Sequence, residues 1–270
     1  MLHDENSGYD MAHIEGLTTA CKNLGLDLDT QLIIKYNVPE DENCYDAAVD
    51  PAEQGCTIIF SDSYGHQTYM LSAAEQYPAV TFVACTGDQA GVAGLDNFKN
   101  LFTNVYESRY VSGVVAGMKP KELLDAGTVT DPYVGYVGAF PYAEVVSGYT
   151  AFLLGIQSIV PEAHMDVQYT NSWYEAGKTV FSVGYNIDML SVAPDAALTS
   201  AQNNWSVLYQ DTLEKFIAGE EVPSNYAAGI AEDAVMISAL GPNCAEGTQE
   251  AVDAAWSAIK DGSLQVFDTS

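Results

Sequence analysis

Residues 134–161, VGYVGAFPYAEVVSGYTAFLLGIQSIVP, decide the fold class of this chain. A short apolar strand at 134–137 runs into a Gly-Ala-Phe-Pro turn, and a helix begins near Tyr142. Loops that leave a sheet at the carboxyl end of a strand are where open α/β folds bind small ligands. This loop is aromatic and uncharged, with neither a phosphate-cradling glycine pattern nor a nucleophile elbow. The stretch therefore predicts a loop that binds rather than reacts.

Strands and helices alternate along the rest of the chain, which indicates an α/β protein. Two such series predict two doubly wound parallel-sheet lobes with a hinge and a cleft. We expect lobe 1 to comprise 1–118 and about 202–226, and lobe 2 to comprise about 119–201 and about 227–270. The stretch 119–132 is interpreted as a crossover between the lobes. The other expected elements are helices at 11–24, 43–54, 106–118, 142–159, 205–217 and 248–259, and strands at 32–38, 57–60, 80–85, 101–105, 165–169, 180–185 and 235–240.

The predicted fold is incomplete in two places. A doubly wound lobe normally opens with a buried strand, whereas this chain begins in a polar loop. Only the residues 170–179 separate the strand at 165–169 from the strand at 180–185, and a parallel pair needs a longer crossover. We infer that a first strand and a helix–strand–helix segment near Tyr174 are absent. The alternative at the second place is an antiparallel hairpin.

Composition and charge exclude several classes of function. The 270 residues include 37 acidic and 9 basic side chains, for a net charge of −28, which repels nucleic acid. No apolar run is long enough to span a membrane, and no signal peptide is visible, so the chain is either cytoplasmic or lacks a removed export segment. The five cysteines lack CxxC spacing, which argues against a metal site and leaves a Cys21–Cys44 disulfide open.

Seven segments, taken in order, carry a family resemblance. They resemble the basic membrane protein family, whose members are extracytoplasmic substrate-binding lipoproteins of ABC transporters with the type I periplasmic-binding-protein fold. Characterised members include purine nucleoside receptors. The segments are HDENSGYDMAHIEGL, VPEDENCYDAAVD, GCTIIFSDSYGHQTYM, YPAVTFVACTG, NVYESRYVSGVVAGM, VGYVGAFPYAEVVSGY and SVGYNIDM.

The resemblance implies roles for individual residues. Tyr9 and Asp10 match the family's aromatic–polar pair, and Trp173 matches the aromatic that stacks on the other face of the base. Asp188 matches the carboxylate that binds ribose hydroxyls. Asn186 stands where many members have a further Asp, and Asn203 stands where the family has Lys, so a cation is missing from the expected pocket.

The residues themselves point to the same kind of ligand. Tyr9, Tyr64, Phe140 and Trp173 follow or flank predicted strands, and a base stacked on an aromatic ring gains about 1–3 kcal/mol. The alternative is that these rings only pack against their own lobe. Carboxylates accept hydrogen bonds from sugar hydroxyls, although an Asp in such a loop is often a helix cap. Ser61, Asp62 and His66 end the strand at 57–60 and are further candidates, with His66 alternatively a helix residue.

The sequence therefore predicts a solute-binding protein that holds a purine nucleoside between two lobes and delivers it to an ABC transporter permease. No nucleotide-binding motif, catalytic triad or metal-ligand spacing occurs, so we expect no enzyme activity, cofactor, metal or nucleic-acid partner. The full-length protein is expected to be a membrane-anchored lipoprotein, with the anchor lying outside this chain. Alternatives are another cargo such as riboflavin or a sugar, an enzyme of nucleoside metabolism, and a ligand-sensing regulator.

Overall fold

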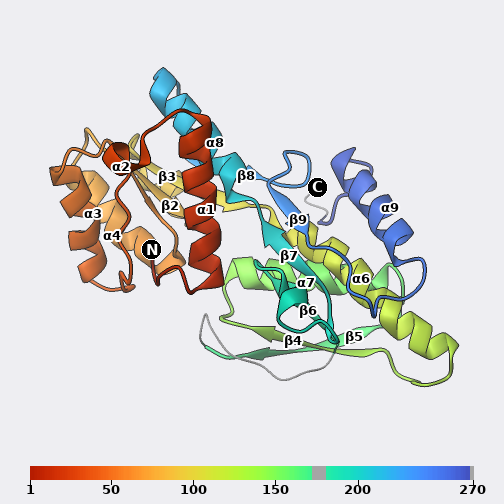
Figure 1. Cartoon of the computed structure of the whole chain (residues 1–270). Helices are drawn as coiled ribbons and strands as arrows, with labels where there is room; N and C mark the ends of the chain where they lie inside the picture. Colours follow the sequence, from red (N-terminus) through yellow and green to blue (C-terminus); the bar gives the residue numbers. More distant parts are fainter. Residues whose placement is uncertain (172–180, 268–270) are drawn as a thin grey trace. The chain divides into compact units, whose positions relative to one another are not determined.

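The computed structural model describes residues 1–171 and 181–267 and divides into two compact units (Figure 1). Unit 1 comprises Met1–Thr103 and Asn204–Ala228. Unit 2 comprises Asn104–Asn203 and Gly229–Ser270. Each unit is thus assembled from two separate stretches of the chain, as expected for a fold in which the chain crosses repeatedly between lobes.

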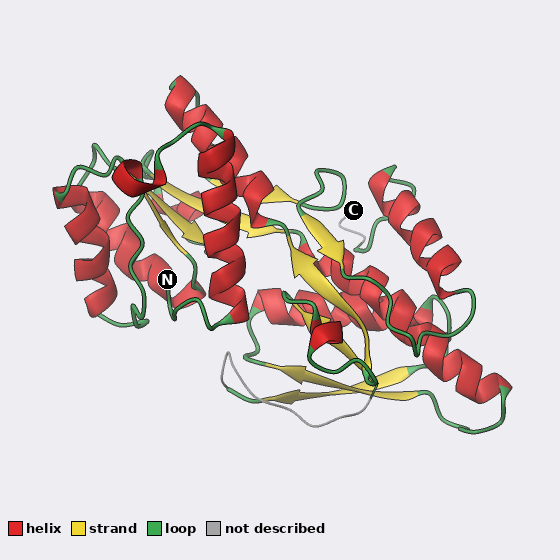
Figure 2. Cartoon of the chain, in the orientation of Figure 1, coloured by secondary structure: helices red, strands yellow, loops and turns green. Residues whose placement is uncertain are grey.

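Unit 1 is built on a four-stranded parallel sheet in the order β1-β2-β3-β8 (Figure 2). Parallel strands that are buried on both faces are apolar throughout, as the fully buried run Phe82–Cys85 shows. The strands are β1 (Ile58–Ser61), β2 (Thr81–Cys85), β3 (Phe98–Thr103) and β8 (Asn225–Ala228), and the helices are α1 (Gly8–Asn23), α2 (Leu28–Gln31), α3 (Asn43–Glu53), η1 (Tyr64–His66), α4 (Gln67–Gln76), α5 (Ala90–Ala93) and α8 (Trp205–Ala218).

Close packing of α1 against α8 fixes the start of α1, where predicted ligand residues lie. A Cβ atom on Gly16 would lie 2.7 Å from Cβ of Trp205, so only glycine permits this approach. The buried His13 ring stacks on Trp205 at a centroid distance of 4.0 Å, and its Nδ1 lies 2.7 Å from the Tyr209 hydroxyl. Burial lowers the pKa of His13 to about 3, so this imidazole is neutral and structural.

Unit 2 contains two small sheets and two long helices that pack together. The pair β4–β5 is parallel, β6–β7 is parallel, and β7–β9 is antiparallel. Glycines allow the helices α6 and α7 to touch, because a Cβ on Gly113 would collide with the backbone of Phe152. The strands are β4 (Tyr133–Gly138), β5 (His164–Tyr169), β6 (Ser182–Tyr185), β7 (Ala197–Asn203) and β9 (Val235–Ile237), and the helices are α6 (Val105–Asp125), α7 (Ala143–Gln157), η2 (Met189–Ser191) and α9 (Thr248–Lys260).

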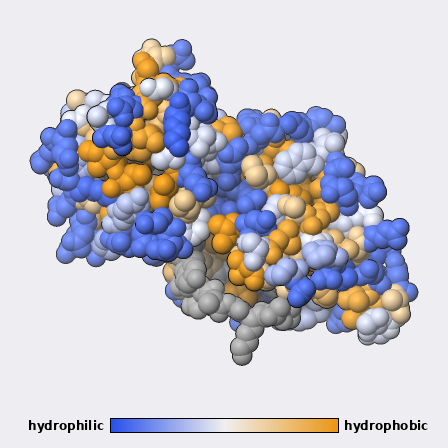
Figure 3. All heavy atoms as spheres, viewed as in Figure 1, coloured by the Kyte–Doolittle hydropathy of each residue, from blue (hydrophilic) through white to orange (hydrophobic). Residues whose placement is uncertain are grey.

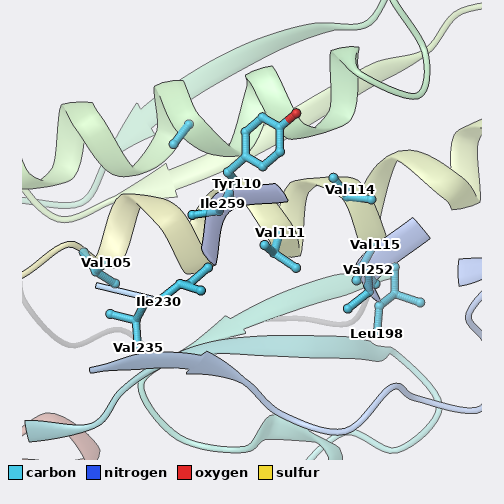
Figure 4. Packing of buried hydrophobic residues seen from close by; sticks show 11 residues of the cluster. Val105, Tyr110, Val111, Val114, Val115, Leu198, Ile230, Val235, Val252 and Ile259 are labelled. Atoms are coloured by element: carbon cyan, nitrogen blue, oxygen red, sulfur yellow. The ribbon is translucent and has the colours of Figure 1, made fainter. Parts of the chain in front are cut away.

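The main core of unit 2 forms along one side of α6. Val111, Val114 and Val115 of this helix are almost fully buried, and they pack with Leu198 of β7 and Val252 of α9 (Figure 4). Burying each such side chain contributes about 1.5–3 kcal/mol. The helix is apolar on more than one face because it also contacts α7, which explains its long uncharged central run.

The predicted α/β fold with parallel sheets is confirmed, but several expected elements differ. The residues 32–38 are extended without forming a strand, because no neighbouring strand pairs with them in the described part of the chain. Helix α6 continues to Asp125, so the expected crossover at 119–132 is helical in its first half. Pro120 lies inside this helix, and Pro51 lies inside α3 without ending it.

The alternative of an antiparallel hairpin at 165–185 is wrong. β5 pairs with β4, and β6 pairs with β7, so the two strands belong to different sheets. β5 pairs with the strand that precedes it along the chain, and β6 pairs with the strand that follows it. The two strands therefore do not have to pair with each other. The Cys21–Cys44 disulfide is also absent, because both cysteines are free and buried.

Candidate functional site

Polar groups gather at the carboxyl end of β1 in unit 1. The strand ends at Ser61, and the buried Asp62 follows it directly. Oδ1 of Asp62 accepts a hydrogen bond from the backbone N–H of Leu2 at 2.9 Å, whereas its Oδ2 has no hydrogen-bond partner among the described residues. A buried carboxylate oxygen without a partner is costly, and it is therefore a candidate for contact with a ligand.

Asp10 lies in the first turn of α1 and is 1% exposed. Its Oδ1 accepts from the backbone N–H of His3 at 2.7 Å, and its Oδ2 lies 3.2 Å from Nδ1 of His3. Burial alone would raise the pKa of Asp10, but hydrogen bonds involving Ser7 and the His3 backbone outweigh burial and lower it. Asp10 is thus a charged carboxylate that holds the opening loop.

The two carboxyl groups differ in protonation. Burial, reinforced by the neighbouring charge of Asp10, raises the pKa of Asp62 to about 7, although the terminal amino group acts in the opposite direction. Two close carboxylates commonly divide in this way, with one ionised and one protonated. Near neutral pH the pair can therefore both accept and donate a hydrogen bond.

The loop after β1 is held in place from several directions. Glu40 accepts from the Ser63 hydroxyl at 2.5 Å and from the Gly65 N–H at 2.9 Å. The Tyr64 hydroxyl donates to Asp88 at 3.1 Å, so this ring is fixed at the surface of unit 1. Tyr9 packs edge-on against His13 at a centroid distance of 4.7 Å.

Ser61 and His66 face inward. Nε2 of His66 lies 2.9 Å from the Val38 carbonyl oxygen and must carry the hydrogen of that bond. Burial lowers the pKa of His66, so its Nδ1 is an unprotonated acceptor. Both Nδ1 of His66 and Oγ of Ser61 are buried without a partner among the described residues, and both side chains line a cavity inside unit 1.

In unit 2, two amides meet at the carboxyl ends of β6 and β7. Nδ2 of Asn203 donates to Oδ1 of Asn186 at 3.1 Å and to the Tyr185 hydroxyl at 3.0 Å. Asn186 adopts φ 67°, a left-handed conformation that Asn tolerates better than most residues. The two residues predicted from the sequence are therefore brought into direct contact.

Sequence reasoning missed the role of Arg109, which is the only arginine of the chain. Its guanidinium lies 4.0 Å from the centroid of the Tyr185 ring. Burial raises the pKa of Glu144 to about 7, although Arg109 acts in the opposite direction. Glu107, which precedes Arg109 by two residues on the same helix, accepts from the Ile230 N–H at 2.6 Å. A lone arginine in an apolar helix was the signal available in the sequence.

The remaining predicted residues differ in their placement. Phe140 stacks on Tyr142 at 5.2 Å in the loop after β4. Asp188 is exposed and caps η2 by accepting from the Leu190 N–H at 3.0 Å, which is the alternative that its position in a loop suggested. Trp173 lies outside the described residues.

Metal-ligand groups and membrane-spanning helices were sought over residues 1–171 and 181–267. No group of three His, Cys, Asp or Glu side chains there could hold a metal ion. No helix in those ranges is long and apolar enough to cross a membrane.

Comparison with known proteins relates most of the chain to the kind of family that its sequence resembles. The family described as ABC transporter substrate-binding protein PnrA-like matches residues 2–180. A purine-binding protein from Brucella abortus (strain 2308) is 25% identical over 96% of this chain and 79% of its own length. A putative ABC transporter glucose-binding protein from Haloferax volcanii is 25% identical over 80% of this chain, which spans 60% of that relative.

Solved structures show the fold. An ABC transporter solute-binding protein from Aeropyrum pernix K1 superposes with a TM-score of 0.74 at 14% identity, over 97% of this chain and 89% of that chain. A transcriptional activator of the comK gene from Bacillus halodurans gives 0.75 at 20% identity, over 97% and 96%. At such identities the likeness concerns the fold alone, which is that of type I periplasmic binding proteins.

Members of the matched family are substrate-binding proteins that supply small solutes to ABC transporters. The chain belongs to the PnrA-like family of ABC transporter substrate-binding proteins, and it is an extracytoplasmic protein that binds a small molecule for a transporter.

Proposed function

We propose that the solute is a purine nucleoside and that the protein delivers it to the permease of an ABC transporter. The observation that carries this proposal is the match of nearly the whole chain to a purine-binding protein. We assign ligand contacts to Tyr9, Asp10, Asp62, Phe140, Trp173, Asn186, Asp188 and Asn203. We also assign ligand contacts to Ser61 and His66, whose buried polar atoms Oγ and Nδ1 have no hydrogen-bond partner among the described residues.

The charge of the site supports a neutral solute. Asp10 is ionised, and its charge acts on the neighbouring Asp62. The whole chain carries a net charge of −28. Carboxylates accept hydrogen bonds from N–H and O–H groups and repel phosphate. A nucleoside supplies such donors on both its base and its sugar, whereas a nucleotide adds charge that this site disfavours.

Unit 2 offers complementary groups. Asn186 and Asn203 present amides, which both donate and accept, and Asp188 presents an exposed carboxylate suited to vicinal hydroxyls. Phe140 and Tyr142 form a stacked aromatic pair in the loop after β4. Aromatic faces of this kind are suited to a base, and stacking contributes about 1–3 kcal/mol.

A sugar is the second candidate. It is favoured by the relative named as a putative glucose-binding protein and by Asn203, which stands where the resembled family has a lysine. Sugars are recognised by the same amides, carboxylates and aromatic faces, so the two candidates differ mainly in the need for a base-stacking surface.

Calorimetry with guanosine, inosine, adenosine, glucose, riboflavin and guanosine monophosphate tests the proposal. We expect the nucleosides to bind and the monophosphate to bind at least tenfold more weakly, a difference of about 1.4 kcal/mol. Binding of glucose alone would transfer the assignment to the sugar. Silence with every nucleoside would overturn it.

The Asp188→Asn variant tests the sugar-binding role of that carboxylate. Asparagine is as good an N-cap as aspartate, so η2 is expected to survive while the charge is removed. Nucleoside affinity should fall about tenfold, or about 1.4 kcal/mol. Asp195→Asn, a change of another exposed carboxylate in unit 2, is the matched control and should leave affinity unchanged.

The proposal includes that the solute is not turned over and that the mature protein carries a lipid anchor. Incubation with inosine and phosphate, followed by chromatography, should return inosine unchanged. Release of hypoxanthine would favour an enzyme of nucleoside metabolism. Expression of the gene in its native host, with mass spectrometry of the membrane fraction, checks the anchor.

A further inference from the structure

A polar cavity of about 370 Å³ lies in unit 1 at the amino end of the sheet. Thr81 begins β2 and Lys99 is the second residue of β3, so this cavity is at the opposite end of the strands from the loop after β1. The rest of its wall is formed by Asp96, by Phe216 in the last turn of α8, and by the residues 220–222. We call it the amino-end pocket.

The lining of the amino-end pocket is mainly charged. Hydrophobic residues gather elsewhere in unit 1, on the face that Figure 3 shows and in the core around β2. Four of the lining residues carry a charge, namely Asp96, Lys99, Glu220 and Glu221. A pocket of this composition is suited to a polar or charged molecule.

Lys99 is the unusual residue of this pocket. It lies on a strand that pairs on both sides, with β2 and with β8, and it is only 7% exposed. No ion pair or hydrogen bond joins its side chain to any residue that the structure describes. Lysine is rarely buried to this degree without a partner, because an unpaired ammonium loses its hydration. Five more exposed lysines do pair with carboxylates, namely Lys35, Lys119, Lys121, Lys215 and Lys260.

The ammonium of Lys99 opens into the amino-end pocket. Nζ is not among the fully enclosed polar atoms of the described chain, so the small exposed part of this side chain includes its charged end. This is the usual arrangement of a lysine whose aliphatic stem is buried and whose head reaches a polar space. The space that it reaches is the one lined by Asp96, Glu220 and Glu221.

Opposite charges therefore line one cavity without meeting. In the described chain none of the three carboxylates forms an ion pair with Lys99, although all four side chains line the same space. A molecule that carries both an anionic and a cationic group could contact both sides at once.

The two acidic walls are held in place by their backbones. Asn97, next to Asp96, donates from its side chain to three backbone carbonyls. Gly219 ends α8 in a left-handed conformation with φ 69°, and the Glu220 N–H returns to the Lys215 carbonyl at 2.8 Å. Such a fixed turn aims the residues after it, so the acidic wall is preorganised.

The lining restricts the chemistry of an occupant. No group of three His, Cys, Asp or Glu side chains within 1–171 and 181–267 could hold a metal ion, so the carboxylates do not form a metal site there. A simple anion is repelled by three carboxylates, and a simple organic cation is repelled by Lys99. A zwitterion is attracted by both walls. Phe216 and Val222 add an apolar surface for a small side chain.

We propose that the amino-end pocket binds a free α-amino acid with a short apolar side chain. Its carboxylate accepts from Lys99 and from the Thr81 hydroxyl, and its ammonium donates to the carboxylates of Asp96, Glu220 and Glu221. The volume is at the small end of the range for ligand pockets, as a free amino acid requires. This site is separate from the solute-binding role.

Calorimetry with L-valine, L-leucine and L-methionine tests the proposal. Two analogues of leucine each lack one charge: 4-methylpentanoate lacks the ammonium, and 3-methylbutylamine lacks the carboxylate. We expect an amino acid of this set to bind and both leucine analogues to bind about tenfold or more weakly than leucine. Equal binding of either analogue would overturn the proposal, and so would silence with all three amino acids.

Lys99→Met keeps the buried unbranched stem and removes the ammonium. Amino-acid affinity should fall about tenfold or more, whereas Lys22→Met, at an exposed lysine of the same unit, should leave it unchanged. The double variant Glu220→Gln, Glu221→Gln changes only exposed side chains, and it should also weaken binding. Unchanged affinity in both the Lys99 variant and the double variant would place the amino acid elsewhere and overturn the proposal. Displacement of the bound amino acid by guanosine would do the same, because it would show that the two share the solute site.

Discussion

Asn203 and Asn186 are joined side chain to side chain, with Nδ2 of Asn203 donating to Oδ1 of Asn186 at 3.1 Å. The bond ties the end of β7 to the residue that follows β6, and both residues are less than a tenth exposed. Because Asn186 has φ 67°, the bond also holds a backbone conformation that costs free energy in isolation. A cation at position 203 could not be accommodated here without a change in this pair.

Replacing Asn203 with alanine should destabilise the protein. The change removes the donor to Asn186 and to the Tyr185 hydroxyl in a buried setting, which costs about 1–3 kcal/mol. Urea unfolding followed by circular dichroism measures the loss. Asn243→Ala removes one exposed hydrogen bond in the same unit and should cost less than about 0.5 kcal/mol. Equal losses in the two variants would show that the Asn186–Asn203 contact contributes nothing special.

The fold could be predicted further than the site because periodicity is local and pairing is not. Apolar alternation placed the strands 134–137 and 80–85 within a residue or two of β4 and β2. The strand expected at 32–38 failed because an extended apolar segment becomes a strand only when a neighbour pairs with it. That condition depends on residues far away in sequence, which no local pattern reports.

For the site, the sequence indicated which residues were candidates, but it did not indicate which of them contact one another. Asn186 and Asn203 were both candidates, and the structure brings them into contact. Asp188 was a candidate for hydroxyl binding, yet its carboxylate also caps η2. The contact of Arg109 with Tyr185 could not be foreseen, since it joins a helix to a strand end 76 residues later (185 − 109).

Replacing Arg109 with methionine should destabilise the protein increasingly as pH rises. Loss of the guanidinium over the Tyr185 ring costs about 0.5–2 kcal/mol at any pH. It also removes the charge that keeps the pKa of Glu144 from rising above about 7. Since the unfolded state ionises this carboxyl near pH 4.3, the folded state loses stability as pH rises through and beyond 7. Urea unfolding at about pH 5 and pH 8.5 tests this.

Arg109→Lys separates the two effects. Lysine keeps the positive charge but loses the planar stacking surface. We expect this variant to lose stability by a similar amount at both pH values, whereas Arg109→Met loses more at the higher one. A methionine variant with no pH dependence would show that Arg109 does not act on Glu144.

The buried carboxyl of Asp62 should make stability fall as pH rises from about 4 to 7. The pKa of Asp62 is about 7 in the folded protein, and the unfolded chain releases this proton near pH 3.9. In this window the folded state binds more protons, so deprotonation favours unfolding. Asp62→Asn removes the effect, and its stability relative to the wild type should rise by about 2–4 kcal/mol between pH 4.5 and pH 8.

Asp10→Asn should show the opposite sign at the acid end. The pKa of Asp10 is lowered in the folded protein, so its charge stabilises the fold above about pH 4, and that stabilisation is lost as pH falls through the folded pKa. The cost of this variant should therefore be larger at pH 5 than at pH 2.5. Parallel pH profiles for Asp10→Asn and Asp62→Asn would contradict the division of charge between the two carboxyl groups.

Replacing Gly113 with alanine should disrupt the packing of α6 on α7. A Cβ atom there would collide with the carbonyl oxygen of Phe152, and backbone cannot yield as a flexible side chain does. The approach is reciprocal, because a Cβ on Gly155 would collide with the carbonyl of Tyr110. Forcing the helices apart costs about 1–3 kcal/mol or more, well beyond the small gain in helix propensity that alanine brings. Gly135→Ala, on β4 with open space around it, is the matched control and should be neutral in urea unfolding. If Gly113→Ala were also neutral, the two helices could not be as close as the backbone contact requires.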